Sequence, residues 1–507
     1  MEAIASIRSR PEDLVSPLLK FWEQHPALYY GLAFLLGCSA AASHQLLALL
    51  PPFAILLVNH WQRSLLACIL ALAAFGYTHE RYLLPEIPAT GLEGAAYISI
   101  QSISDSSSSY GYGWVFKGVI HSFVPQGETE SIARGVSFRM TVPKKGRAER
   151  PTGDTNYIIH SAKLRKTANG TYYLNSGKQA HWYPVDGWLC LAEMRFNIKH
   201  AVKRYIQDHI ADRRSANLLV GLVTGEFSDQ QTRSSLGRFG LQHILAISGF
   251  HFAIIVSILA LCFSMLLPRK ACSIALLIAT TSYYIVLGFG PSIMRAYICA
   301  TIFLLGQLLD RPAKALNSMG IALLAILLYD PLSATSAAFQ LSFVATAAIL
   351  LLFKPMDEFL ALLWNRRSLA HISEMSLLDQ HGFLILSIFR QALALSLAVH
   401  LLTIPVCLYY FQKFPVLSLF YNLFFPFLVS ISMLLLITAS ITQLGFLHTI
   451  NSALTQTTLN LTFNVPLSWD IMIRTHQPPV WLVVAATTTI FAAAVYLRQR
   501  SLEPDFI

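Results

Sequence analysis

The sequence predicts a polytopic α-helical membrane protein with a small extracytoplasmic β-rich, OB-like insert domain. The chain has 507 residues, of which 54% are hydrophobic and only 13% are charged, whereas soluble domains carry about 25% charged residues. Long stretches within residues 28–80 and 241–500 are nearly free of charge, as is typical of membrane-spanning helices. Residues 81–240 have the composition of a soluble region. The pattern indicates an integral membrane protein with one hydrophilic insert.

The N-terminal part divides into a tail and a short membrane region. Residues 1–27 are polar, with Arg8, Arg10 and Lys20, and we expect a cytoplasmic N-terminal tail. Residues 28–80 are expected to hold the N-terminal transmembrane segments, in three apolar runs at 28–43, 46–59 and 64–77. Each run is shorter than the ~20 residues of a usual spanning helix. Three short or tilted spans, or two spans with a re-entrant bend at Pro51 and Pro52, both fit this pattern.

Residues 85–190 are expected to form a periplasmic OB-like domain. Apolar residues alternate with polar ones, which predicts half-buried strands, at 114–120, 136–142, 157–162 and 171–174. Clusters of Gly, Pro, Asn and Ser separate these segments. Four or five short strands in a segment of this length favour a small closed barrel such as an OB-fold.

Residues 191–240 change to a helical period, and we expect amphipathic or interfacial helices there. Met194, Ile198 and Ile206 share one helical face, with Lys199 and Lys203 off it. Such a helix either lies on the membrane surface or packs on protein.

Residues 241–500 are expected to form a polytopic channel domain, followed by a C-terminal tail at 501–507. The candidate spans are 241–267, 271–289, 293–309, 315–329, 335–353, 383–411, 416–442 and 480–497. Basic residues gather in alternate loops, so the positive-inside rule places these loops and the N-terminus in the cytoplasm and the insert outside. The run 416–442 contains Asn422 and Pro426, which fits one kinked helix or two half-spans.

A group of polar residues lies at the start of this domain. His243, Ser248 and His251 flank an apolar run, and polar groups in a bilayer usually line a cavity or find a partner. A pore lining, a cluster that bonds neighbouring helices, and a hydrolase with Ser248 as nucleophile and His251 as base stay open. The nearby carboxylates are Glu226 and Asp229.

Further polar residues lie within the apolar runs. Arg295 begins a span, where it either snorkels to the interface or acts as a functional charge. Gln340, His400 and Asn422 are isolated, and each either bonds neighbouring helices or lines a path.

The insert alternates basic and aromatic residues, as single-strand binding surfaces do. Aromatic rings stack on bases and cations follow phosphates. Alternatively, the aromatic residues form the barrel core and the lysines a solvated face. The candidate DNA-binding residues are Trp114, Phe116, Lys117, Arg139, Lys144, Lys145, Arg147, Lys163, Arg165 and Lys166.

The sequence contains no motif for a metal centre or an ATP-driven motor. None of the 16 histidines forms an H-x-H pair, and neither H-E-x-x-H nor a Walker A loop occurs. We therefore expect no cofactor and no metal, and we assign no enzymatic activity to this chain.

The residues from Gly240 to His251, together with Gly225 and Glu226, resemble the central signature of the ComEC-type competence family. The family pattern is approximately Gly-Asp, a spacer, and Gly-Leu-x-His-Leu-x-Ala-Ile-Ser-Gly-Leu-His. Further matches in order and spacing occur at 290–292, 295–296, 330–331, 339–343 and Pro405.

The resemblance implies an inner-membrane, multi-pass channel that takes single-stranded DNA from the periplasm to the cytoplasm in natural transformation. The implied partners are single-stranded DNA, a periplasmic DNA receptor, a cytoplasmic ATPase or helicase of the competence machinery, and the lipid bilayer, with a homo-oligomer left open. The channel-lining or polar-motif residues on this hypothesis are Gly225, Glu226, His243, Ser248, Gly249, His251, Arg295, Gln340, His400 and Asn422. The alternatives are an intramembrane serine/histidine hydrolase of lipid or cell-wall intermediates, and a non-catalytic membrane scaffold.

The chain departs from the family pattern in several places. Glu226 stands where Asp is usual, and Phe250 where Leu is usual. Many members end in a metallo-β-lactamase-like nuclease, and this chain stops where that domain would begin, so strand degradation is expected either to fall to another protein or not to be coupled to transport here. Cys190 is the only cysteine of the insert, which therefore cannot form the disulfide that some members carry there.

Overall fold

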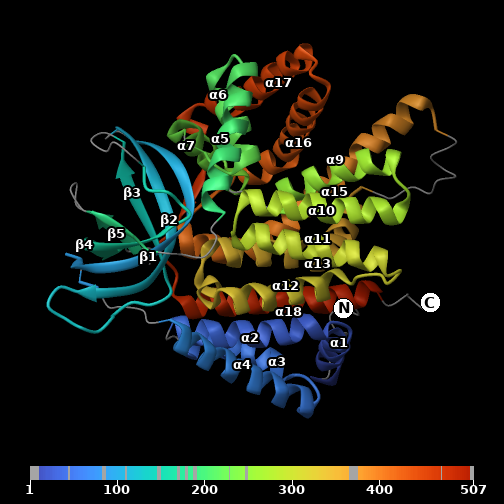
Figure 1. Ribbon diagram of the computed structural model, residues 1–507. Coiled ribbons are helices and arrows are strands. Elements are labelled where there is room, and N and C mark those ends of the chain that lie inside the picture. The colour runs from blue at the N-terminus through green and yellow to red at the C-terminus, as the bar shows by residue number, and fades with distance from the viewer. Residues whose placement is uncertain are drawn as a thin grey trace.

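The computed structural model shows a helical body with a β-barrel at one end (Figure 1). The structure describes residues 11–43, 46–82, 87–88, 90–108, 111–144, 150–167, 172–176, 181–185, 191–227, 229–245, 249–364, 375–469 and 471–502. Within these residues, seven helices are long and apolar enough to cross a membrane. The predicted class, a polytopic helical membrane protein with a small β-rich insert, is therefore confirmed.

The N-terminal helices pack along one side of the helical body. They are α1 (Pro11–Gln24), α2 (Pro26–Ser43), η2 (Leu46–Leu49), α3 (Leu50–Leu57) and α4 (Trp61–Arg81). α2 approaches α12 closely, because a Cβ added at Gly320 would lie 2.3 Å from the backbone of Ala27. The helical segment Leu46–Leu57 is short and apolar, and at 1.5 Å per residue it rises about 18 Å, well below the ~30 Å of a bilayer core. This length favours the re-entrant arrangement over three spans.

The insert is a barrel closed by a pairing between its first and fourth strands. The strands are β1 (Leu92–Ser108), β2 (Gly111–Pro125), β3 (Val136–Pro143), β4 (Asn156–Lys166), β5 (Tyr172–Ser176) and β6 (Trp182–Val185). The sheet order is β1-β2-β3-β5-β4-β6, and β1 also pairs with β4. Five strands therefore form a ring in the described part of the insert, with β6 added to β4, as expected for an OB-like barrel.

Three helices connect the barrel to the helical body: α5 (Ala192–His209), α6 (Arg213–Thr224) and α7 (Gln230–Arg238). α5 packs against β1, α6 and α10, so this helix contacts protein along part of its length. Met194 and Ile198 on its other side remain exposed. Asp212 and Asp229 cap α6 and α7 by accepting bonds from backbone amides.

The helical body contains the long apolar helices. Its elements are α8 (Gln242–Leu245), α9 (Gly249–Leu266), α10 (Arg269–Leu287), α11 (Pro291–Leu308), α12 (Ala315–Tyr329), η3 (Pro331–Thr335), α13 (Ala337–Ala361), α15 (Leu377–Phe411), β7 (Lys413–Pro415), α16 (Ser418–Thr442), α17 (Gly445–Phe463), η4 (Leu467–Trp469), β8 (Met472–Arg474) and α18 (Val480–Leu502). The run 416–442 forms one helix, α16, with Pro426 inside it. Of the run 241–267, α8 up to Leu245 and α9 from Gly249 are helical, and residues 246–248 lie outside the described residues.

The two ends of the helical body are formed by different loops and contacts. At one end the α9–α10 and α11–α12 loops meet, where Lys270 lies 3.5 Å from Asp310. At the other end Arg195 of α5 donates a 2.6 Å bond to the carbonyl of Ile285 in α10. α1 and the end of α18 lie away from the barrel (Figure 1). The barrel thus lies near the end of α10, and the α9–α10 and α11–α12 loops lie at the other end of the helical body.

Candidate functional site

The signature segment begins with a tight turn after α7. Gly240 has a φ of 68°, a conformation that glycine adopts without a steric penalty. A Cβ at this position would lie 2.6 Å from the Cβ of Ser418 on α16. Gly240 is therefore needed both for the turn and for the contact with α16.

Three histidines from three helices surround this turn. His243 of α8 is exposed and lies within electrostatic range of both His251 and His400. His251, in the first turn of α9, is fully buried. The three side chains thus form one polar group, although they are up to 157 positions apart in the chain.

His400 of α15 is held by two contacts. Its Nδ1 lies 2.7 Å from the carbonyl oxygen of Ser396, to which it donates. In a neutral imidazole this leaves Nε2 to accept from the Ser418 hydroxyl at 3.1 Å. Ser418 was not singled out in the sequence analysis, and its contact with Gly240 is a feature of the tertiary structure.

Arg295 of α11 lies against the first residue of α9. A Cβ at Gly249 would stand 2.6 Å from Nη2 of Arg295, so glycine leaves the room that the guanidinium occupies. Arg295 Nε donates a 2.9 Å bond to the hydroxyl of Ser342 on α13. Among the described residues, no carboxylate is within ion-pair distance of this cation. Ser248 lies outside the described residues.

The two isolated amides differ in their environment. Gln340 donates a 2.9 Å bond to the carbonyl of Ala334, which ties α13 to η3 and gives Gln340 a structural role. Asn422 lies one turn after Ser418 on α16, and its buried Oδ1 has no hydrogen-bond partner in the described part of the chain. A buried amide oxygen without a hydrogen-bond partner lowers the stability of the fold, so Asn422 remains a candidate for the polar path.

Gly225 and Glu226 follow the end of α6. Gly225 has a φ of 76° and ends the helix in the left-handed conformation. The Oε1 of Glu226 lies 3.4 Å from Nζ of Lys199 on α5. Burial raises the pKa of the Glu226 carboxyl, and the Lys199 cation opposes this rise.

The described residues do not complete a hydrolase site. Glu226 pairs with Lys199, and Asp229 accepts from the Gln231 amide at 3.0 Å and the Thr232 hydroxyl at 2.6 Å. Neither carboxylate contacts His251, as an orienting third group would. The described residues also contain no group of three or more His, Cys, Asp or Glu arranged to hold a metal ion.

The outer face of the barrel carries a row of basic and aromatic side chains. Lys117 of β2 is paired with Arg139 of β3, and both are exposed. Arg139 is paired with Tyr173 of β5, which is paired with Arg165 of β4. Directly paired residues lie on the same face of a sheet. We call Lys117, Arg139, Tyr173 and Arg165 the barrel row.

Phe116 is wrong as a stacking platform. Its side chain is 0% exposed in the barrel core and contacts the ring of Trp182. Adjacent residues of a strand point to opposite faces, so Phe116 and Lys117 cannot both face a ligand outside the barrel. That alternation is visible in the sequence and could have excluded Phe116.

The other basic candidates have different neighbours. Trp114 is partly buried and packs against the barrel core, with Nζ of Lys144 at 5.3 Å from its ring centroid. Lys163 pairs with Glu93 at 3.0 Å. Lys166 lies 5.3 Å from the centroid of a tyrosine ring on β5. Two remaining candidates lie outside the described residues: Lys145 and Arg147.

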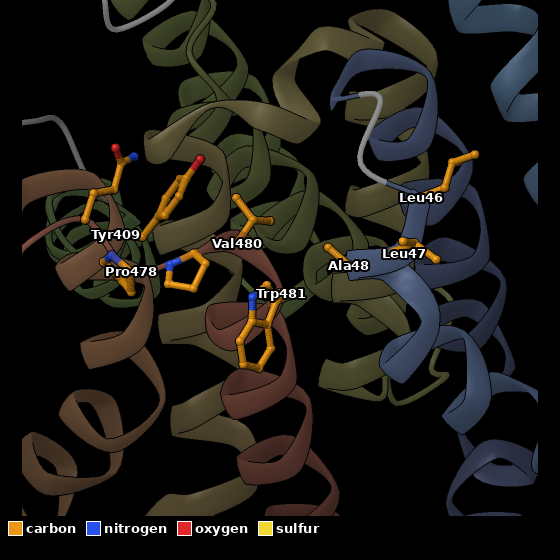
Figure 2. Close-up of a pocket in the computed structure, with 9 residues that line it drawn as sticks. Leu46, Leu47, Ala48, Tyr409, Pro478, Val480 and Trp481 are labelled. Atoms are coloured by element: carbon orange, nitrogen blue, oxygen red, sulfur yellow. The ribbon is translucent and has the colours of Figure 1, made fainter.

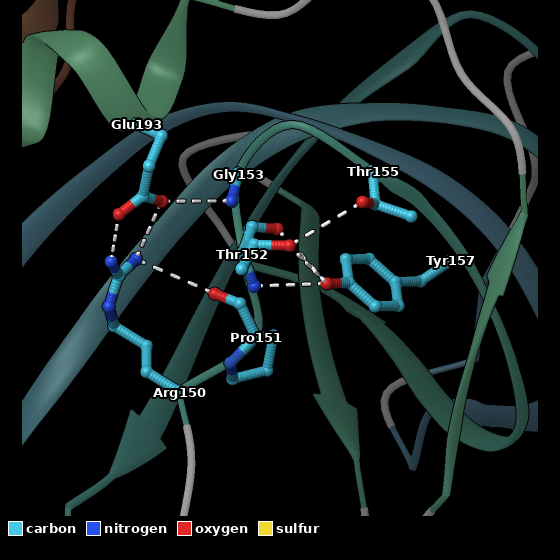
Figure 3. A network of polar contacts seen from close by, with 7 residues as sticks. All are labelled: Arg150, Pro151, Thr152, Gly153, Thr155, Tyr157 and Glu193. Atoms are coloured by element: carbon cyan, nitrogen blue, oxygen red, sulfur yellow. Dashed lines mark hydrogen bonds and ion pairs between the residues drawn. The ribbon is translucent and has the colours of Figure 1, made fainter.

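A polar network fixes the barrel to α5 (Figure 3). Arg150 pairs with both carboxylate oxygens of Glu193 in the first turn of α5, and the Gly153 amide donates to Glu193 at 3.1 Å. The Arg150 guanidinium also lies over the ring of Phe196, 4.6 Å from its centroid. Burial opposes ionisation of Glu193, but the Arg150 and Gly153 bonds outweigh it and hold its pKa below the usual value.

A cavity of about 680 Å³ lies apart from these residues. Leu46, Leu47 and Ala48 form one side, and Tyr409 and Trp481 lie across from them (Figure 2). The lining is mostly apolar and includes none of the polar residues of the signature segment. This cavity is therefore not part of the candidate site.

Comparison with known proteins adds evidence for the helical body. The model of the family described as Competence protein matches residues 222–500. ComE operon protein 3 of Bacillus subtilis (strain 168) is 23% identical over 306 residues, which cover 57% of this chain and 35% of that relative. The chain thus matches only about a third of the relative's length. No solved structure matches the chain.

Proposed function

Because the chain belongs to the Competence protein family, we propose that this competence-related multi-pass membrane protein conducts single-stranded DNA from the periplasm to the cytoplasm. The proposed membrane is the bacterial inner membrane, with the barrel in the periplasm and the N-terminus in the cytoplasm. Natural transformation is the process that requires this step. The proposed partners are a periplasmic DNA receptor, a cytoplasmic ATPase or helicase, and other copies of this chain in an oligomer.

One observation carries the proposal: cations lie on the barrel row, at Lys199 close to it, and in α11 at Arg295. Lys117 lies within electrostatic range of Lys199 on α5. Lys199 donates a 3.3 Å bond to the carbonyl of Leu287, at the end of α10. The α10–α11 turn follows, and Arg295 lies in the second turn of α11. A strand that carries one phosphate per nucleotide requires cations at successive positions of this kind.

The surroundings of Arg295 favour an anion as its ligand. The guanidinium lies beside Gly249 on α9, and no carboxylate among the described residues is within ion-pair distance of it. An arginine without a carboxylate partner can pair with a phosphate. The neighbouring polar groups of His243, Ser418 and Asn422 suit a hydrated path.

The barrel row supports a role in receiving the strand. Exposed cations can contact phosphates, and the ring of Tyr173, which is partly exposed, can stack on a base. The β2–β3 face, to which Lys117 and Arg139 belong, is also the surface that OB-folds use for oligonucleotides.

The test is the entry of fluorescent DNA into cells that lack this protein. Complementation with the wild-type gene should restore cytoplasmic signal, whereas His251→Ala should leave DNA in the periplasm at equal protein levels. Normal cytoplasmic entry in the deletion strain would reject the transport function. A scaffold predicts that His251→Ala transports normally. A hydrolase predicts labelling by a serine-reactive phosphonate that is lost in Ser248→Ala.

A further inference from the structure

A dense group of charges lies where the barrel meets α5 and the α6–α7 turn. Its members come from β1, β2 and β3, from the residue that follows β3, from α5, from the α6–α7 turn and from α7. We call this group the junction cluster, and it comprises Lys117, Arg139, Lys144, Lys199, Lys203, Arg233, Asp105 and Glu226.

Ion pairs connect several members of the junction cluster. Asp105 lies 3.1 Å from Lys144 and 3.4 Å from Lys203. Glu226 lies 3.4 Å from Lys199. The cluster therefore holds six cations against two carboxylates, and its excess charge is positive.

The cluster joins exposed and half-buried charges. Lys117 and Arg139 are exposed, whereas Lys199 and Glu226 are half-buried. Burial, together with the Arg139 and Lys199 cations, lowers the pKa of Lys117. Half-buried charges interact more strongly than charges in open water, because the effective dielectric constant is lower.

Lys199 and Arg233 are each held by a hydrogen bond that does not involve Glu226. Lys199 also donates to the carbonyl of Leu287 at 3.3 Å, and Arg233 donates to the carbonyl of Phe227 at 2.6 Å. The backbone of Glu226 is held by a 3.2 Å hydrogen bond that its N–H donates to the Thr224 hydroxyl. The carboxylate can therefore move away while the cations and the turn keep their places.

We propose that the junction cluster is a binding site for backbone phosphates of a single strand, and that the Glu226 carboxylate fills a phosphate position when no strand is bound. The inference rests on the proposed function and deepens it. A carboxylate and a phosphate both accept bonds from a lysine ammonium. An arriving phosphate displaces Glu226 from Lys199, and the carboxylate returns when the phosphate moves on. Glu226 thereby limits how tightly the strand is held, which a transport path requires.

The test measures binding of fluorescein-labelled oligo(dT) to the full chain in nanodiscs over a range of salt concentrations. Glu226→Gln should bind more tightly than the wild type, because the competing charge is gone. Lys199→Gln should bind more weakly, and the slope of log K against log salt should fall by about 1. Asp310→Asn and Lys270→Gln are the matched controls, since they alter an ion pair of similar length, 3.5 Å, at the other end of the helical body.

The outcomes separate this inference from the function on which it rests. Equal affinities of Glu226→Gln and Asp310→Asn, with wild-type binding intact, overturn the inference and leave the proposed function standing. Absence of strand binding by the wild type at any salt concentration overturns both. If Glu226→Gln does not elute as a single species, the test uses Lys199→Gln instead. A slope of log K against log salt for Lys199→Gln that equals the slope for Lys270→Gln overturns the inference.

Discussion

Gly249 leaves the space that the guanidinium of Arg295 occupies. A Cβ at Gly249 would lie 2.6 Å from Nη2 of Arg295, closer than a carbon and a nitrogen can approach. The cation therefore packs on the backbone of α9, and its Nε is oriented by Ser342 at 2.9 Å. The glycine of the signature segment and the arginine in the second turn of α11 form one structural unit.

Gly249→Ala should displace Arg295 and weaken transport. The added methyl group overpacks the contact, which typically costs about 1–3 kcal/mol of folding free energy. Gly382→Ala is the control, because a Cβ at Gly382 meets no atom within 4 Å and a helical Gly→Ala change there should stabilise by roughly 0.4–1 kcal/mol. Thermal unfolding in detergent and DNA entry in cells measure the two effects. Equal behaviour of both variants would contradict the assigned contact.

The barrel row should contribute to strand binding through charge. Lys117→Gln and Arg139→Gln should each weaken binding of oligo(dT) to the full chain and lower the salt slope by about 1. Arg134→Gln removes an exposed cation from the β2–β3 connection and should leave the slope near the wild-type value. A uniform loss in all three variants would mean that total charge, and not the barrel row, sets the affinity.

Tyr173 and Phe116 should separate stacking from core packing. Tyr173→Ala removes a partly exposed ring, and loss of a base–aromatic stack weakens binding by about 1–3 kcal/mol per base. Phe116→Leu changes a ring that is 0% exposed and should lower stability by up to roughly 1.5 kcal/mol without changing the affinity. Anisotropy titrations and thermal melts of the full chain measure the two quantities. An affinity that depends on Phe116 and not on Tyr173 would reverse this assignment.

The Arg150–Glu193 pair should make the attachment of the barrel sensitive to acid. The pKa of Glu193 is held below its usual value in the folded chain, so its stabilising contribution is complete above that usual value. The contribution is lost as pH falls through the lowered pKa, because the protonated carboxyl no longer pairs with Arg150. Thermal melts of wild type and Glu193→Gln should therefore differ at pH 7 and converge in acid.

A double-mutant cycle gives the strength of this attachment. Arg150→Ala, Glu193→Gln and the double variant should show a coupling of roughly 0.5–3 kcal/mol, as residues in direct contact do. A coupling near zero at pH 7 would show that the pair in Figure 3 does not hold the barrel.

The sequence predicts the elements that local patterns encode. Apolar runs located the long helices, since a spanning helix is recognisable from its own composition. Strand β1 was missed, although buried and less buried residues alternate from Gly94 to Ile100, ahead of the register shift between Ile100 and Ser102. The contact of Gly240 with Ser418 was missed as well, since hydropathy does not report contacts between distant segments.

The site was predictable only in part. Arg295 and Gly249 were both selected, but their contact joins residues on different helices and has no local signal. The junction cluster was not predicted, because Asp105 and Lys203 are 98 positions apart and their pairing depends on how α5 packs against β1. Charge patterning within a segment cannot supply such a pairing.

Arg295 gives the most direct test of whether the helical body needs a cation on the path. Arg295→Lys keeps the charge but loses the bond that Nε donates to Ser342, so cytoplasmic DNA entry should fall only partly. Arg295→Gln removes the charge, and hydrogen bonds to charged groups contribute about 1.5–3 kcal/mol. Entry should then fall by about tenfold or more, since 1.4 kcal/mol corresponds to a factor of ten.

Arg269→Gln is the control for Arg295→Gln, because Arg269 is an exposed cation at the start of α10, at the end of the helical body opposite the barrel. Its entry rate should stay close to wild type at equal protein levels in the membrane. If both glutamine variants transport equally well, Arg295 only anchors α11 to α13 through Ser342, and the anion path must avoid it. If Arg295→Lys is as defective as Arg295→Gln, transport depends on the geometry of the Arg295 guanidinium against α9 and not on its charge.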